Sequence, residues 1–166
     1  MSNRRTFILA GLGAATALPF VRSFLETPAL AAAATKFEYV LTDAQWRKKL
    51  PGAAYDVLRH EATERPFTSP LNDEHRAGVF ACKGCALPLF SSKTKFDSGT
   101  GWPSFYAPLA GAVGTTSDTS LFMTRTEVHC RRCGGHLGHV FDDGPKPTGL
   151  RYCMNGVAMT FTPAKA

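Results

Sequence analysis

The second half of the chain alternates short apolar runs with polar turn segments. From residue 78 onward these runs are rich in Val, Phe, Thr and Tyr, and clusters of Gly, Pro, Asp and Ser separate them. Such a pattern is typical of β-strands joined by turns. The runs are GVFAC (78–82), PLFSS (88–92), SLFMTRTEVHC (120–130), LGHVF (137–141) and LRYCMNGVAMTF (150–161). Because no helix-length periodicity follows residue 66, we predict a mainly antiparallel β fold.

Two short helices are predicted before the strands. Thr42 is followed three residues later by Gln45, which is the capping-box pattern of a helix start. Pro51 ends this helix, and Tyr55 and Leu58 stand at helical spacing in the segment after it. The prolines and small polar residues of ERPFTSPLND (64–73) then predict a loop.

The first 34 residues have the pattern of an export signal. Arg4 and Arg5 precede an apolar run that ends in a string of alanines, and RRTFIL resembles a twin-arginine signal. The alternative is an uncleaved membrane anchor, which needs roughly 20 strongly apolar residues. This run is short, contains Gly and Thr, and has Pro19 near its end. We therefore expect a periplasmic protein without a stable membrane span, with one domain over residues 35–166.

Charge gives no support for nucleic-acid binding. The chain carries a net charge of +6, and without residues 1–34 about +4 remains. No long run of Lys or Arg and no stripe of alternating basic and aromatic residues is present. We expect no nucleic-acid partner.

Four of the five cysteines form two C-x-x-C pairs, CKGC (82–85) and CRRC (130–133). Two such pairs complete the tetrahedral set of sulfur ligands that Zn²⁺ prefers, and a full set leaves no open position for water. We predict one structural Zn²⁺ per chain, bound by Cys82, Cys85, Cys130 and Cys133. The alternative is two disulfides, which the periplasm favours. Because twin-arginine substrates are moved folded, the zinc could be loaded before export.

The fifth cysteine, Cys153, has no partner in the sequence. Alternation along a strand places Arg151, Cys153 and Asn155 on one face. The positive charge of Arg151 would favour the nucleophilic thiolate of Cys153. The alternative is an inert buried cysteine, since free cysteine is often part of a core.

Two histidines and a tryptophan are further candidates for a site. His136 and His139 follow the second C-x-x-C closely and could hold or transfer a proton near neutral pH. Trp102 stands in SGTGWPS, where the glycines Gly99 and Gly101 predict a tight turn that presents the indole. The alternatives are zinc-ligating or surface histidines and a core tryptophan. We interpret the remaining histidines and tryptophan as surface or packing residues: His60, His75, His129 and Trp46.

Several segments, in this order, resemble the B-type methionine-R-sulfoxide reductases. They are RHEATERPFTSPLND (59–73), GVFACKGCALPLF (78–90), KFDSGTGWPSF (95–105) and EVHCRRCGGHLGHVFDDGPKPTGLRYCMNG (127–156). The resemblance implies two antiparallel sheets in a barrel-like arrangement and a four-cysteine zinc. It implies Cys153 as the nucleophile. It also assigns catalytic roles to His136, His139 and Asn155, and substrate contacts to Trp102, Phe141, Asp143 and Arg151.

The chain departs from the family pattern at two positions. Many members have a cysteine where this chain has Thr100, and a serine where it has Gly156. Without a second redox cysteine, the resemblance implies that a sulfenic acid on Cys153 is reduced by an outside thiol, from a thioredoxin-like protein or a small reductant. The expected substrates are free methionine sulfoxide and proteins or peptides that contain it, and the expected state is a monomer.

Two other classes of function stay open from the residues. A zinc-stapled binding module would need the four cysteines but leaves Cys153 and the paired histidines unexplained. A thiol–disulfide oxidoreductase would use one C-x-x-C pair free of metal, yet the chain lacks the βαβ pattern expected around such a motif.

Overall fold

A computed structural model describes residues 37–120 and 123–165 of the chain. It begins with helix α1 (Asp43–Lys49) and helix α2 (Gly52–His60). The predicted capping box is present: the backbone N–H of Gln45 donates to the Thr42 hydroxyl, and the backbone N–H of Thr42 donates to the Gln45 side chain. Both predicted helices are confirmed.

The predicted export signal, residues 1–34, lies outside the described residues. Within the part of the chain that is described, neither helix has the length and apolar character needed to cross a membrane.

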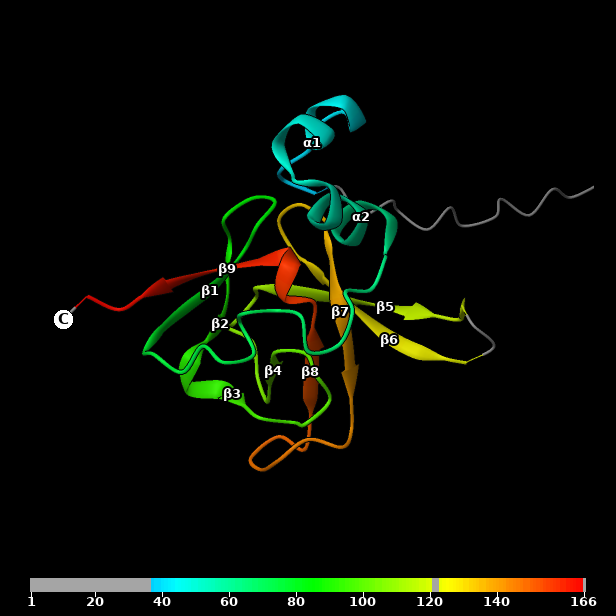
Figure 1. The fold of residues 1–166 in the computed structure, drawn as a ribbon. Helices are drawn as coiled ribbons and strands as arrows, with labels where there is room; N and C mark the ends of the chain where they lie inside the picture. Colours follow the sequence, from blue (N-terminus) through cyan, green and yellow to red (C-terminus); the bar gives the residue numbers. More distant parts are fainter. Residues whose placement is uncertain (1–36, 121–122, 166) are drawn as a thin grey trace, which may run out of the picture. The chain divides into compact units, whose positions relative to one another are not determined.

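The rest of the described chain is built on two antiparallel sheets (Figure 1). The smaller sheet has the order β2-β1-β9 and the larger has the order β3-β4-β8-β7-β6-β5. The strands of the smaller sheet are β1 (Gly78–Cys82), β2 (Pro88–Ser91) and β9 (Met159–Pro163). Those of the larger sheet are β3 (Lys95–Phe96), β4 (Ser104–Phe105), β5 (Val113–Asp118), β6 (Arg125–Cys130), β7 (His136–Phe141) and β8 (Arg151–Met154).

The mainly β class and the two antiparallel sheets are confirmed. The barrel-like arrangement is not, because neither sheet closes on itself among the described residues. The predicted strand over 150–161 is divided: the 3₁₀ turn η3 (Gly156–Ala158) separates β8 in one sheet from β9 in the other. Three strands were not predicted. β3 and β4 are two residues long, and β5 reads VGTTSD, with too few apolar residues to give a strand pattern.

An aromatic cluster joins the two sheets. Phe105 of β4 stacks on Phe90 of β2 with ring centroids 4.3 Å apart and meets Phe80 of β1 edge to face at 4.9 Å. All three side chains are fully buried. Full burial of such a side chain is worth about 1.5–3 kcal/mol, so these contacts fix the larger sheet, with β8 at its centre, against the smaller one.

The helices cover the second cysteine pair. Helix α2 packs against β7 and η3, and its Tyr55 and Leu58 are buried (Figure 1). The guanidinium of Arg59 donates to the carbonyl of Cys133 and stacks over the buried Trp46 ring. The interpretation of Trp46 as a packing residue is thus consistent with its position.

Candidate active site and metal cluster

The four cysteines of the two C-x-x-C pairs converge on one buried point. Their sulfur atoms all lie within 4.8 Å of one another. Between the pairs, the sulfurs of Cys82 and Cys133 are 3.7 Å apart and those of Cys85 and Cys130 are 3.5 Å apart. Four sulfurs at about 2.3 Å from a tetrahedral Zn²⁺ would lie about 3.8 Å apart. The cluster therefore has the dimensions and ligand chemistry of a four-cysteine metal site.

These separations argue against both thiol alternatives. A disulfide needs an S–S bond of about 2.05 Å, and all five cysteines are free. The C-x-x-C oxidoreductase alternative is also disfavoured, because each sulfur contacts one from the other pair and all four side chains are buried.

A metal ion here would connect the two sheets. Cys82 ends β1 of the smaller sheet, and Cys130 ends β6 of the larger sheet. The strands between the two cysteine pairs carry the chain from the smaller sheet into the larger one.

Cys153 lies on β8 between β4 and β7. In the antiparallel register it is directly opposite Ser104 on one side and His139 on the other. Directly opposite residues share a face of a sheet, so the thiol and the His139 imidazole lie on the same face. The Thr100 hydroxyl lies 3.8 Å from the Cys153 sulfur.

A cavity of about 130 Å³ opens at this thiol. Five of the predicted site residues line it, namely Trp102, His139, Phe141, Cys153 and Asn155. The other lining residues were not predicted: Thr63, Arg125 and Gly138. The cavity thus offers an indole and a phenyl ring as apolar walls and an imidazole and a carboxamide as polar groups around one cysteine.

Trp102 is fixed by its ring nitrogen. The indole Nε1–H donates to the backbone carbonyl of Glu64 at 2.9 Å, and the side chain is only half-buried. The turn before it uses Gly101 with a φ of 91°, a conformation that favours glycine. The prediction that glycines present this indole at a site is consistent with this geometry, and the alternative of a core tryptophan is not.

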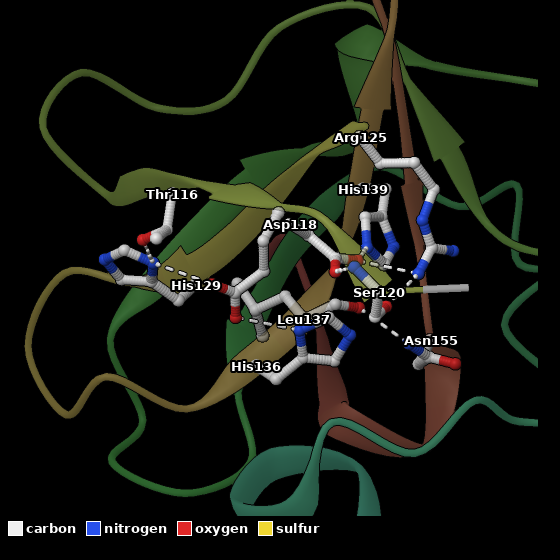
Figure 2. A network of polar contacts seen from close by, with 10 residues as sticks. Thr116, Asp118, Ser120, Arg125, His129, His136, Leu137, His139 and Asn155 are labelled. Atoms are coloured by element: carbon white, nitrogen blue, oxygen red, sulfur yellow. Dashed lines mark hydrogen bonds and ion pairs between the residues drawn. The ribbon is translucent and has the colours of Figure 1, made fainter. Parts of the chain in front are cut away.

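His139 contacts a carboxylate that also binds an arginine (Figure 2). Nε2 of His139 and Nη2 of Arg125 lie 2.8 Å and 2.7 Å from the same oxygen of Asp118. Hydrogen bonds from Ser120 and His139 and the charge of Arg125 hold the pKa of Asp118 well below its usual range. An ionised carboxylate can only accept, so Nε2 carries the proton and Nδ1 is left as an acceptor. Burial lowers the pKa of His139, against the raising effect of Asp118, so the ring is neutral at neutral pH.

His136 is buried beside His139 and does not line the cavity. The two ring centroids are 5.4 Å apart, and Figure 2 shows both rings on β7, where Leu137 and Gly138 separate the two residues. Nδ1 of His136 lies 2.9 Å from Glu127, whose pKa is lowered to about 2 by hydrogen bonds from His129 and His136. Nε2 of His136 is buried and has no hydrogen-bond partner among the described residues. The predicted pair is therefore together, but only His139 reaches the cavity wall.

Asn155 has its carboxamide held by the backbone. Its Nδ2 donates to the carbonyl of Leu137 at 3.1 Å (Figure 2), and its Oδ1 accepts from the N–H of Glu64 at 2.8 Å. Since the Nδ2 group carries two hydrogens, one remains for a ligand in the cavity. The side chain is 4 % exposed, so its orientation is fixed.

Arg151 and Asp143 form a pair at the edge of the site. Two guanidinium nitrogens of Arg151 donate to the two carboxylate oxygens of Asp143, each at 2.8 Å. The guanidinium also lies 4.4 Å from the centre of the Phe141 ring. Neither charged residue lines the cavity. The pair holds Phe141, which lines the cavity, in place as a wall. The direct substrate contacts predicted for Arg151 and Asp143 stay predictions.

Burial raises the pKa of the Cys153 thiol, while the Thr100 hydroxyl and the charge of Arg151 act in the opposite direction. The predicted effect of Arg151 on the thiolate is therefore present but smaller than the effect of burial. Before a ligand binds, the thiol form is favoured at neutral pH. A nucleophile in this state needs a neighbouring group that accepts its proton.

Comparison with known proteins decides the family. Residues 50–163 match the SelR domain model. The chain is 56% identical over 123 residues to the peptide methionine sulfoxide reductase MsrB of Thiobacillus denitrificans, covering 74% of this chain and 93% of that protein. The chain belongs to the MsrB family. The MsrB proteins of Pseudomonas putida (58% identical, 72% and 90% covered) and Agrobacterium fabrum (53% identical, 74% and 91% covered) are similar to it.

The departures from the MsrB pattern have different structural consequences. Thr100 lies beside the Cys153 sulfur, where a cysteine could pair with it. At Gly156, an added Cβ would overlap with the Ser69 hydroxyl and approach Pro103. In this MsrB chain the buried Ser69 fills the space that a side chain at position 156 would need.

Sequence reasoning missed four polar residues of this MsrB site: Glu64, Asp118, Arg125 and Glu127. Alternation along β6 would have placed Arg125 and Glu127 on one face of a strand, and this was the available signal. Asp118 ends the unpredicted β5, and Glu64 lies in a loop. Their contacts to His139, His136 and Asn155 arise from strand pairing and loop packing, which spacing in the sequence does not report.

Proposed function

We propose that this MsrB-family protein reduces the R epimer of methionine sulfoxide, free or in proteins and peptides, to methionine. The observation that supports this most directly is the cavity in which Cys153 shares one sheet face with His139 and is walled by Trp102 and Phe141. The identity to curated reductases over most of both chains supports the reaction class.

The reaction starts with attack of the Cys153 sulfur on the sulfoxide sulfur. A transient S–S bond forms. The oxygen then moves to the Cys153 sulfur as the sulfoxide S–O bond and the S–S bond break, and methionine leaves. The thiol and the sulfoxide become a cysteine sulfenic acid and methionine, so the cysteine is oxidised by two electrons and the substrate is reduced by two. The thiol proton ends on the transferred oxygen, and the atoms balance without any other reactant.

His139 is suited to move that proton. Its Nδ1 is an acceptor on the face of the thiol, because Asp118 holds the proton on Nε2. It takes the Cys153 proton as the thiolate attacks and donates it to the sulfoxide oxygen as the S–O bond breaks. The free N–H of Asn155 donates a hydrogen bond to the same oxygen. His136, buried and bound to Glu127, holds the position of His139 through ring contact.

Trp102 and Phe141 account for the proposed choice of epimer. Two aromatic rings favour an S-methyl group, whereas the imidazole and carboxamide favour the oxygen. With the methyl and oxygen sites fixed on opposite sides of the sulfur, only one configuration presents its sulfur to Cys153.

An assay on each epimer of a blocked methionine sulfoxide, with dithiothreitol as reductant, tests the proposal. The wild-type protein is expected to convert the R epimer at least about a hundredfold faster than the S epimer, since the wrong epimer exchanges a polar and an apolar partner. Product methionine derivative is quantified by chromatography. Preference for the S epimer, or no turnover of either, would contradict the assignment.

The proposal includes one structural Zn²⁺ at the four-cysteine cluster. Cys82, Cys85, Cys130 and Cys133 would hold it, and the sulfur separations fit the ion. Zinc bound by four sulfurs stabilises the fold and has no open position for substrate. The cluster thiols are therefore unavailable for recycling Cys153.

Recycling by an outside thiol follows from the residues near Cys153. Thr100 cannot form a disulfide, and the remaining cysteines belong to the cluster. A thioredoxin-like protein or a small thiol attacks the sulfenic acid and releases water. A second thiol group then attacks the mixed disulfide, which restores Cys153 and leaves the reductant oxidised.

The variant Thr100→Cys is expected to gain an internal disulfide. The Thr100 hydroxyl lies 3.8 Å from the Cys153 sulfur, so a sulfur at this side chain can reach it after a small movement. One turnover without reductant should leave wild type with a sulfenic acid that dimedone labels, and the variant with a mass lower by two hydrogens and no label. Mass spectrometry of the peptides checks both. An internal disulfide in wild type would contradict the recycling route.

The proposed location is the periplasm, after export of a folded monomer by a twin-arginine signal over residues 1–34. The support is the sequence pattern at Arg4 and Arg5. The mature domain would then comprise residues 35–166.

A further inference from the structure

One loop residue contacts two residues that line the cavity and the turn that follows β8. Glu64 lies in the segment between α2 and β1, which has no regular structure. Its carbonyl accepts from the Trp102 indole at 2.9 Å, and its N–H donates to the Asn155 side chain at 2.8 Å. Its carboxylate accepts from the backbone N–H of Val157 at 2.7 Å. The methyl wall and the oxygen-binding amide of the proposed site are thus connected through a single residue.

The carboxylate of Glu64 acts as a cap for the turn that follows β8. Asn155 is the N-cap of the 3₁₀ turn η3, but its side chain makes no capping hydrogen bond. An asparagine at such a position ordinarily accepts from the first backbone N–H groups of the turn. Here Glu64, from another segment, accepts from Val157 instead. The carboxamide of Asn155 is thereby available for its bonds to Leu137 and Glu64, which hold it at the cavity.

Apolar packing does not hold this segment from the other side. A second cavity, of about 610 Å³, borders it, and Thr63, Glu64 and Arg65 are among its lining residues. Thr63 and Arg65 are also exposed. The N–H of Phe67 donates to the carbonyl of Gly101 at 2.7 Å further along the segment. At residue 64 itself, with open space on that side, the polar contacts of Glu64 hold the backbone against Trp102 and Asn155.

We infer that Glu64 is a positioning residue that sets the separation between Trp102 and Asn155, and through it the preference for one sulfoxide epimer. This inference rests on the proposed function. Every backbone contact of residue 64 survives substitution, so the role of the side chain is to hold the segment in place. Its loss lets the indole and the carboxamide move relative to Cys153, and a displacement of about 1 Å can cost a reaction up to about a hundredfold.

The test compares Glu64→Ala with Glu64→Gln, which keeps an oxygen acceptor for the Val157 N–H. Glu61→Ala is the matched control, because it removes an exposed glutamate carboxylate of the same segment that lines neither of the two cavities above. Glu64→Ala is expected to lower kcat for the R epimer about tenfold or more, with a smaller change in KM, and to lower the R-to-S ratio. Glu64→Gln should recover wild-type values within about threefold, and Glu61→Ala should match wild type.

A second measurement does not depend on activity. Hydrogen exchange of the Trp102 indole N–H, assigned in a ¹H–¹⁵N spectrum with Trp102→Phe, reports the bond to Glu64. Exchange should be faster in Glu64→Ala and unchanged in Glu64→Gln. If Glu64→Ala does not fold, Glu64→Asp carries the test, because the shorter side chain cannot reach Val157 and should give the same changes to a smaller degree.

The results separate the two proposals. Unchanged epimer ratio and unchanged indole exchange in the folded Glu64→Ala or Glu64→Asp variant would overturn the role of Glu64 while leaving the reductase assignment intact. An inactive wild type would overturn the reductase assignment, and the indole exchange would still decide whether Glu64 fixes Trp102.

Discussion

Replacement of Cys153 by serine is expected to lower the rate of methionine sulfoxide reduction at least about a thousandfold. The reaction needs a sulfur that can attack, accept the oxygen and be reduced again, and a serine hydroxyl can do none of these at neutral pH. His139 and Asn155 remain in place, but without a nucleophile there is no proton transfer or oxygen transfer for them to assist. The assay is product formation from the R epimer with dithiothreitol, together with dimedone labelling after one turnover.

The same variant should keep its fold. Cys153 is only partly buried, and serine has nearly the same shape. Its melting temperature is expected to stay within a few degrees of wild type, and the zinc content should not change. Thiol-dependent activity close to wild type in a folded Cys153→Ser protein would show that another cysteine is the nucleophile, and the proposed mechanism would fall.

Loss of one cluster cysteine is expected to have the largest effect on stability. Cys130 is fully buried at the end of β6, and its sulfur is 3.5 Å from that of Cys85 near the other sheet. Cys130→Ser should lose zinc and lower the melting temperature by at least about 10 °C, or fail to fold, because metal binding contributes folding free energy on the order of ten kcal/mol at such sites. Elemental analysis and thermal denaturation measure both effects.

Wild type treated with a chelator under mildly denaturing conditions provides a second form of this test. It should lose one equivalent of zinc per chain and unfold at a lower temperature, and added Zn²⁺ should reverse both changes. Cys153→Ser serves as the matched cysteine control, with zinc retained. Two results would contradict a structural zinc. One is a wild-type protein with less than about half an equivalent of zinc, and the other is a Cys130→Ser variant with the same melting temperature as wild type.

Much of the fold was predictable because its helices and several of its strands are specified by patterns of residues close together in the sequence. The capping box at Thr42 and Gln45 formed as predicted, since both of its hydrogen bonds are made within one turn. The strand β1 has the predicted bounds, because the apolar run and the turn residues on either side of it are both visible in the local sequence. The strand over 150–161 was divided by η3, in which the N–H of Val157 donates to the carboxylate of Glu64, 93 residues away. No local pattern reports such a contact.

The sequence by itself determined the chemistry available to this protein: a lone Cys153 beside paired histidines, two C-x-x-C pairs, and a Trp102 turn, in an order that resembles one family. The tertiary structure decided which residues meet. It placed His139 in the cavity and His136 behind it, paired Asp143 with Arg151, and brought Glu64, Asp118 and Arg125 to the site. The physical reason is that residue type and spacing fix what a side chain can do and which face of its own strand it occupies. Its partners depend on the register between strands and on loops that cross from one sheet to the other.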